Sequence, residues 1–175
     1  MAVVESFWET TSEPNLRQGE FMPRCPVPFV EGLPLAGEPP QSVPIRRYNL
    51  IVLTQSCDLE QQKVRLVSLC PIFPITRFEE INEEMKKKGR WEEVRKGRVE
   101  GLHLLNSPQN PTDNRASLVV DFREIYSLPL TLLVQLAQAT GTRWCLRPPY
   151  LEHFSQAFAR FYMRVGLPSA IAPFK

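Results

Sequence analysis

The sequence predicts a single α+β domain with antiparallel strands at its centre and an amphipathic helix at its C-terminal end. A dense β-branched and apolar run over Tyr48–Thr54 is typical of a strand, and Lys63–Cys70 has the pattern of its partner. Apolar and aromatic residues recur at three- and four-residue spacing between 151 and 165, which indicates a helix with one buried face. At 175 residues, with 43% hydrophobic and 23% charged residues, the chain has the length and composition of one globular domain.

The central strands are expected to pair through a modest polar loop at residues 55–62, with the first strand covered on both faces. Residues 1–16 are expected to be a flexible N-terminal arm, and residues 17–175 to form the single domain. A proline-rich stretch over residues 22–44 must be extended or turning, because proline lacks an N–H group and disfavours helix before it. It has room for a short edge strand near residues 27–30.

A charged segment at about residues 77–98 is predicted to be a helical insertion, divided by Gly89 into two short helices. Its acidic residues lead and its basic residues trail, which suits the helix dipole and favours a solvated, self-paired surface.

The remaining elements follow from short apolar runs. Strands are expected at residues 102–105 and 117–122, with residues 124–126 continuing the sheet after a bend, and the polar loop at 107–114 is expected to be exposed. A helix is predicted after Pro129 and before Gly141, and the last helix after Pro149.

Charge and apolar content exclude several classes of protein. The net charge of +2 is nearly balanced, so binding to nucleic acid or membrane would need a local patch. The apolar runs are too short to span a bilayer, and the N-terminus lacks a signal core, so the expected location is the cytoplasm, without membrane contact. Four cysteines without a CxxC pair are expected to be buried thiols and not disulfides.

The strongest candidate binding residues follow the central strand: Thr54, Gln55, Ser56, Cys57 and Asp58. Strand ends on rigid sheets are common sites, and these residues are expected on the surface in a loop. The alternative is a turn in which the hydroxyl and carboxyl groups bind backbone groups. A nucleophilic Cys57 would need a histidine nearby, whereas the adjacent Asp58 raises a thiol pKa.

Arg46 and Arg47 precede the same strand and have the planar donor groups that bind phosphate, although a solvated strand entrance is the equal alternative. His103 lies between apolar residues on a short strand, so a half-buried structural imidazole is favoured over a catalyst. A metal site from Cys57, His103 and a further cysteine has no supporting spacing. No metal and no cofactor are therefore predicted.

Four stretches resemble strands of the MazF/PemK-like toxin family. The opening strand of that family is similar to Arg17–Glu20, and its Arg-Pro-x-x-Val-x-x-Ser strand is similar to Arg46–Ser56. The family's next strand is similar to Val64–Ile72, and its closing strand, which precedes a final helix, is similar to Ser117–Tyr126. The resemblance implies an SH3-like barrel, usually dimeric, and in many members cleavage of single-stranded RNA. A strand-start Arg and a Thr after the second strand shape that site. Here Arg46 or Arg47 matches the Arg, Phe73 occupies the Thr position, and the charged insertion is foreign to the compact toxins.

Three functions remain open from the sequence. The first is a non-catalytic binding module that contacts nucleic acid (single-stranded RNA) or a protein partner through the rim around the central strand, as a monomer or a homodimer. The alternative is a toxin-like endoribonuclease, in which Arg46 or Arg47 stabilises the phosphorane charge and His103 or Asp58 moves protons. The third is a subunit that docks through the Phe-rich helix or the Pro-rich arm.

Overall fold

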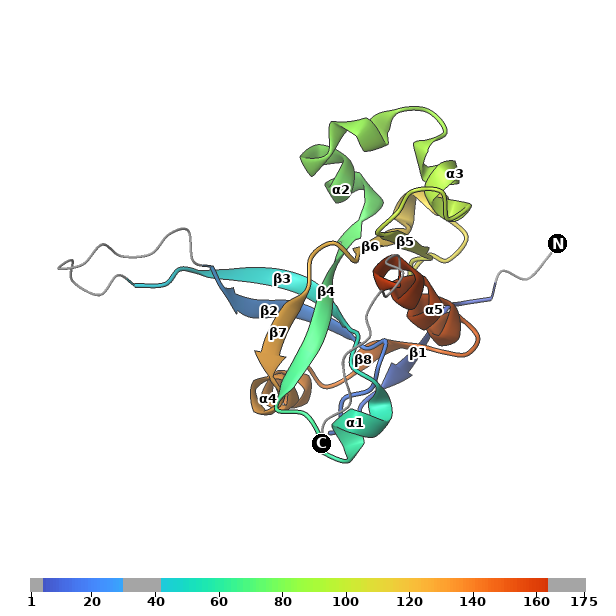
Figure 1. The fold of residues 1–175 in the computed structure, drawn as a ribbon. Coiled ribbons are helices and arrows are strands. Elements are labelled where there is room, and N and C mark those ends of the chain that lie inside the picture. The colour runs from blue at the N-terminus through green and yellow to red at the C-terminus, as the bar shows by residue number, and fades with distance from the viewer. Residues whose placement is uncertain (1–4, 30–41, 164–175) are drawn as a thin grey trace, which may run out of the picture.

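The computed structural model describes residues 5–29 and 42–163 and shows an α+β fold with antiparallel strands (Figure 1). The strands are β1 (Trp8–Thr11), β2 (Phe21–Pro28), β3 (Ile45–Val52), β4 (Leu66–Pro74), β5 (Leu102–Leu105), β6 (Leu118–Asp121), β7 (Tyr126–Pro129) and β8 (Arg143–Leu146). The helices are α1 (Ser56–Glu60), α2 (Ile75–Ile81), α3 (Arg90–Arg95), α4 (Leu130–Thr140) and α5 (Tyr150–Tyr162), with short 3-10 helices η1 (Glu83–Lys86) and η2 (Asn114–Ala116).

Strand β4 organises the six-stranded sheet, whose order is β2-β3-β4-β6-β5 with β7 also paired to β4. Its first half pairs with β7, its middle with β3 and its last residues with β6. β6 and β7 follow each other along the chain and pair with successive parts of β4, so the sheet does continue after a bend. The continuing strand lies later than predicted, because β7 shares only Tyr126 with the expected residues 124–126. The predicted antiparallel central pair is confirmed as well.

The central strand differs from its prediction in its burial. Only the second half of β3, Leu50–Val52, is fully buried, whereas Ile45, Arg46 and Arg47 are exposed. The exposed half pairs with β2 alone and forms a hairpin that projects from the body of the domain (Figure 1). Coverage of both faces is therefore limited to the part of β3 that lies beside β4.

A closed barrel, which the sequence analysis expected, is not detected among the described residues. β1 and β8 form a separate two-stranded sheet, joined to the start of β2 through a single bridge between Glu20 and Cys145. Near β5, the chain entering β1 is held by Asn106 alone: Trp8 Nε1 donates to its backbone oxygen at 2.8 Å, and Phe7 N donates to its Oδ1 at 3.3 Å. In the described part of the chain, bonds to Asn106 are found here, where a closed barrel would need a ladder of strand hydrogen bonds.

The N-terminal segment was expected to be a flexible arm, but residues 8–11 pair with β8 and belong to the packed domain. Trp8 is 4% exposed and Leu16 is 2% exposed. The physical reason is that Trp8 buries its ring while its N–H reaches a carbonyl, as a buried indole requires. This part of the expectation is corrected, whereas residues 1–4 lie outside the described residues.

The proline-rich segment contains a longer strand than predicted. β2 spans eight residues and lies at an edge of the six-stranded sheet, where prolines without an N–H group are tolerated. Its pairing with β3 shifts register between Met22 and Cys25, beside Arg24 with a φ of 53°. The predicted edge strand near 27–30 is confirmed as far as Pro28, and residues 30–41 lie outside the described residues.

The insertion folds as two short helices with a 3-10 turn between them, and Gly89, with a φ of 83°, marks the predicted division. Its exposed face carries ion pairs within the segment, among them Arg77–Glu80 and Lys87–Glu84. Its other face buries Phe78, among others, against Val119 of β6 in a small core of its own. The self-paired surface is confirmed, and this core fixes the insertion to the sheet.

Helix α5 has the predicted apolar face, and Phe154 is completely buried in a core with residues of β1, β3, β4, β6 and β8. Helix α4 covers a separate core cluster on the sheet, formed mainly by residues of β2, β3 and β4. The predicted helix after Pro129 is confirmed, with Gly141 at its C-terminal cap.

A completely buried ion pair connects the N-terminal part of the chain to β8. Arg143 Nε donates to Glu20 Oε2 at 2.9 Å, and the two side chains are 1% and 0% exposed. The remaining donors of the guanidinium reach the backbone oxygens of Ala137, Gly141 and Glu13. Burial raises the pKa of the Glu20 carboxyl, and the hydrogen bond from Arg143 opposes that shift.

We expect Arg143→Ala to lower the free energy of unfolding by about 3–5 kcal/mol, because it removes the buried cation that pairs with Glu20 and the side-chain donor to the carbonyl groups of Gly141 and Glu13. Urea denaturation at pH 7 measures the change. The matched control is Arg147→Ala, whose exposed pair with Glu5 at 3.8 Å is worth at most about 1 kcal/mol. Equal, small losses in both variants would contradict the structural role of Arg143.

Candidate functional site

The polar residues after β3 lie on the surface, as predicted, but they begin helix α1 instead of forming a loop. Thr54 Oγ1 accepts a hydrogen bond from Ser68 N at 2.8 Å, and Ser56 Oγ accepts one from Gln18 N at 3.0 Å. These contacts support the interpretation that the hydroxyl groups bind the backbone. Asp58, the proton-transfer candidate on α1, is half-buried.

Cys57 is the one exposed cysteine, which corrects its predicted burial. Its thiol lies 3.7 Å from Gln55 Oε1 and 3.9 Å from Asp58 Oδ1, with no histidine among its contacts. The other three cysteines are buried, and burial raises the pKa of Cys25 to about 11. Those three have the properties of small apolar side chains, as expected.

Arg46 and Arg47 lie on the exposed half of the β2–β3 hairpin. The guanidinium of Arg46 stands 3.3 Å from the centre of the Phe29 ring, and Arg47 Nη1 donates to the backbone oxygen of Arg24 at 3.4 Å. A strand of eight residues is about 27 Å long, so the arginines and residues 54–58 lie at opposite ends of β3. The structure does not bring the two arginines together with Asp58 or His103.

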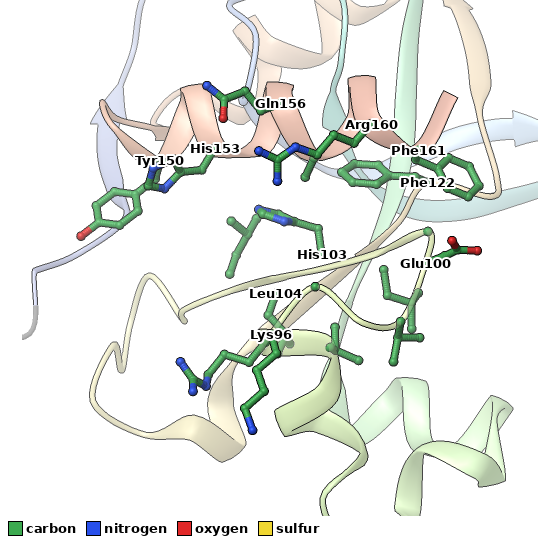
Figure 2. Close-up of a pocket in the computed structure, with 18 of the residues that line it drawn as sticks. Lys96, Glu100, His103, Leu104, Phe122, Tyr150, His153, Gln156, Arg160 and Phe161 are labelled. Carbon is green, nitrogen blue, oxygen red and sulfur yellow. The ribbon is translucent and has the colours of Figure 1, made fainter. Parts of the chain in front are cut away.

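A cavity of about 770 Å³ lies between helix α5, strand β5 and the end of α3 (Figure 2). Helix α5 contributes Tyr150, His153, Gln156 and Arg160, which lie along one side of it. The opposite wall comes from β5 and from the turn after α3. The polar face of α5, which the sequence pattern assigns to solvent, thus borders the cavity.

His103 lies in β5 on the floor of this cavity. Its ring stacks on Phe122, with centroids 5.9 Å apart and planes 23° apart, and it also contacts Phe154. Burial lowers the pKa of His103 to about 4, and the nearby His153 adds a smaller effect in the same direction. The structure supports the predicted half-buried imidazole, which is neutral at pH 7.

The ring nitrogens of His103 make no hydrogen bond with any described residue, and they are not among the fully buried, unsatisfied atoms of that part of the chain. A neutral imidazole carries one donor and one acceptor. Because both nitrogens are accessible from the cavity, His103 offers a ligand one hydrogen bond of each kind.

Of the basic side chains around the cavity, some form ion pairs with described residues and one does not. Arg95 donates two hydrogen bonds of 2.6 Å to Glu92, and Lys96 lies 3.5 Å from the same carboxylate. Arg160 makes no ion pair or hydrogen bond with a described side chain, and its guanidinium lies over the cavity beside His103 (Figure 2).

Aromatic rings complete the walls. Phe7 stacks on Tyr150 with ring centroids 3.8 Å apart and planes 15° apart, and His153 meets Tyr150 edge-on at 6.3 Å. Phe161 lines the end of the cavity near Gly101. The site therefore combines flat rings, an open imidazole and a guanidinium that has no ion-pair partner among the described residues, which are groups that bind planar anionic ligands.

No family model, curated protein or solved structure matches the chain. Within residues 5–29 and 42–163, no group of three or more His, Cys, Asp and Glu side chains is arranged to hold a metal ion. No helix in the same ranges has the length and apolar character needed to cross a membrane.

The sequence analysis identified His103 as a candidate but did not place the other residues of the cavity beside it. A usable signal exists in helix α5, where His153, Gln156 and Arg160 recur at spacings of three and four and so share one face. The aromatic residue Phe7 carries no such signal, because its place depends on the pairing of β1 with β8.

The stability of the domain should fall as the pH drops from about 6.5 to about 4. The unfolded chain protonates His103 near pH 6.5 but the folded chain only near pH 4, so stability from the neutral ring is complete above 6.5 and is lost below it. Glutamine does not titrate, so the unfolding free energy of His103→Gln should decline less over this pH window than that of the wild type. The difference between the two declines should be at most about 3 kcal/mol. Guanidinium denaturation at pH 7, 6, 5 and 4.5 compares the two; parallel curves would contradict the burial of His103.

Proposed function

We propose that this domain is a non-catalytic binding module that holds single-stranded nucleic acid in the cavity between α5, β5 and α3. The observation that carries the proposal is the convergence of the unpaired Arg160 with stacked aromatic rings and the open imidazole of His103. Proteins that bind single strands combine cations for the phosphates with rings on which bases stack.

Each group has a role in this proposal. Arg160, with Lys96 on the opposite wall, offers positive charge to a phosphate, and a guanidinium can bind two phosphate oxygens at once. Tyr150, which is half-buried at the cavity, offers ring surface to a base. His103 offers one hydrogen-bond donor and one acceptor to the edge of that base. Each ring nitrogen would then form a hydrogen bond that it does not make with a described residue.

A single strand fits this site better than a duplex. The rings line a cavity, which only an unpaired base can enter, whereas a duplex presents its phosphates and groove edges. The net charge of +2 gives the molecule no strong overall field, so affinity would come from the local cations.

The interpretation as a subunit that docks through its Phe-rich helix has less support. Phe154 is completely buried and Phe158 packs in the same core, so the domain itself occupies this face. Part of the Pro-rich segment lies outside the described residues. Membership of the MazF/PemK-like family, dimer formation and a cytoplasmic location stay predictions.

The second candidate is an endoribonuclease, and one observation favours it. Both histidines of the chain border the cavity, together with Arg160. In such an enzyme one imidazole accepts the proton of a ribose 2′-OH as the 2′ oxygen attacks the adjacent phosphorus, and the guanidinium neutralises the phosphorane. The bond from phosphorus to the 5′ oxygen of the next nucleotide then breaks, and the second imidazole gives that leaving oxygen a proton. We rank it second, because a pKa of about 4 makes His103 a weak base at neutral pH.

Arg160→Ala should weaken binding of a fluorescently labelled single-stranded RNA at least about tenfold, and should reduce the salt dependence of binding by about one counterion. Fluorescence anisotropy at several salt concentrations measures both. The matched control is Arg46→Ala/Arg47→Ala, which removes two cations from the hairpin and should leave affinity near that of the wild type. A larger loss in the hairpin variant would contradict the cavity as the binding site and favour the rim of β3.

The same RNA, analysed on a denaturing gel, separates the two functions. Binding without cleavage supports the binding module. Cleavage that is lost in both His103→Gln and His153→Gln supports the endoribonuclease. Absence of both binding and cleavage, for RNA and DNA of several sequences, would contradict both proposals.

A further inference from the structure

A second cavity, of about 320 Å³, adjoins the first on the side of the insertion. The two share four lining residues: Phe7, Arg95, Leu104 and Leu105. The smaller cavity is bounded by Trp91 of the insertion and by Asn114 and Ser117 near η2. The two hollows are therefore adjacent and together make up a groove along β5, with the four shared residues at their junction.

We propose that the charged insertion forms a second subsite, in which this groove receives the nucleotide next to the one held beside His103. This inference rests on the proposed function and assigns a role to the insertion. It requires a wall that keeps its shape, polar groups that are free to bind a base, and a cation where the linking phosphate would lie.

The wall is held in place by specific contacts. Trp91 Nε1 donates to Glu79 Oε1 at 2.8 Å, and its ring meets Phe78 edge-on at 6.1 Å. Glu79 in turn accepts two hydrogen bonds from Arg115, at 2.8 and 2.9 Å, which connect the insertion to η2. Trp91 is only half-buried, so part of its ring is open to the smaller cavity.

Two side chains in the smaller cavity have hydrogen-bonding groups to spare. The amide of Asn114 and the hydroxyl of Ser117 make no hydrogen bond with any described residue. Asn106, by contrast, already uses its amide to hold Phe7 N and the Glu5 carbonyl. Asn114 and Ser117 together offer donors and acceptors to the edge of a base.

The junction of the cavities suits a phosphate that links two nucleotides. Arg95 borders both cavities, and its partner Glu92 borders the smaller one. The Arg95–Glu92 pair is exposed, so its guanidinium can exchange a carboxylate in water for a phosphate at low cost. The Phe7–Tyr150 stack at the same place provides a platform between adjacent bases.

The test measures affinity against the length of the ligand. Isothermal titration calorimetry with uridine and adenosine 5′-monophosphates, and with the corresponding di-, tetra- and hexanucleotides, gives the affinity at each length. A dinucleotide should bind at least about tenfold more tightly than the monophosphate. Asn114→Ala/Ser117→Ala should remove most of that gain and leave the affinity for the monophosphate unchanged.

Arg77→Ala is the control, because Arg77 lies in the same insertion, is exposed, pairs with Glu80 and does not border either cavity. It should retain the full gain with length. If oligonucleotides bind but gain nothing beyond one nucleotide, or the Asn114/Ser117 variant matches the wild type, the second subsite is wrong while the proposed function stands. If no ligand of any length binds, the proposed function itself fails.

Discussion

The buried ion pair between Arg143 and Glu20 is the interaction on which the arrangement of the domain depends. It joins residues 123 positions apart in the sequence, and the same guanidinium also reaches the ends of α4 and of the N-terminal segment. A buried pair of this kind is tolerated only where further hydrogen bonds satisfy the charged groups, and here every nitrogen of Arg143 has an acceptor.

The position of the cavity walls depends on this ion pair. Arg143 begins β8, which aligns β1 beside it and so brings Phe7 to the edge of the cavity. β8 leads directly to Arg147, whose N–H donates to the Phe7 carbonyl and whose own carbonyl accepts from Tyr150 N at the start of α5. The stacked rings of Phe7 and Tyr150 are thus placed by backbone contacts that follow from the position of β8.

The elements that the sequence predicted are those with strong local patterns. The apolar face of α5, the strand at 102–105 and the helix between Pro129 and Gly141 each carry their signal within a few residues. β1 and β8 have four residues each and find their partners far away in the chain, so no local pattern indicates them. Whether the strands close into a barrel depends on that pairing and on the contacts of Asn106, and neither can be read from a local pattern.

The candidate site was predictable only in part, for related reasons. His103 was noticed as a polar residue on an apolar strand, but its neighbours in space come from α5, α3 and the N-terminal segment. The polar stripe of α5 has the pattern of a solvent-facing surface, because a helix pattern does not show which element lies opposite it. Arg46 and Arg47 are close to Thr54 in the sequence, whereas an extended strand separates them from it in space.

A chemical-shift map of the ¹⁵N-labelled protein, titrated with a single-stranded hexanucleotide, tests the location of the binding site most directly. The account predicts that the largest changes fall on amides of α5, of β5 and of the end of α3, with the His103 ring signals among them. Changes concentrated on the β2–β3 hairpin or on α1, with α5 unaffected, would contradict it.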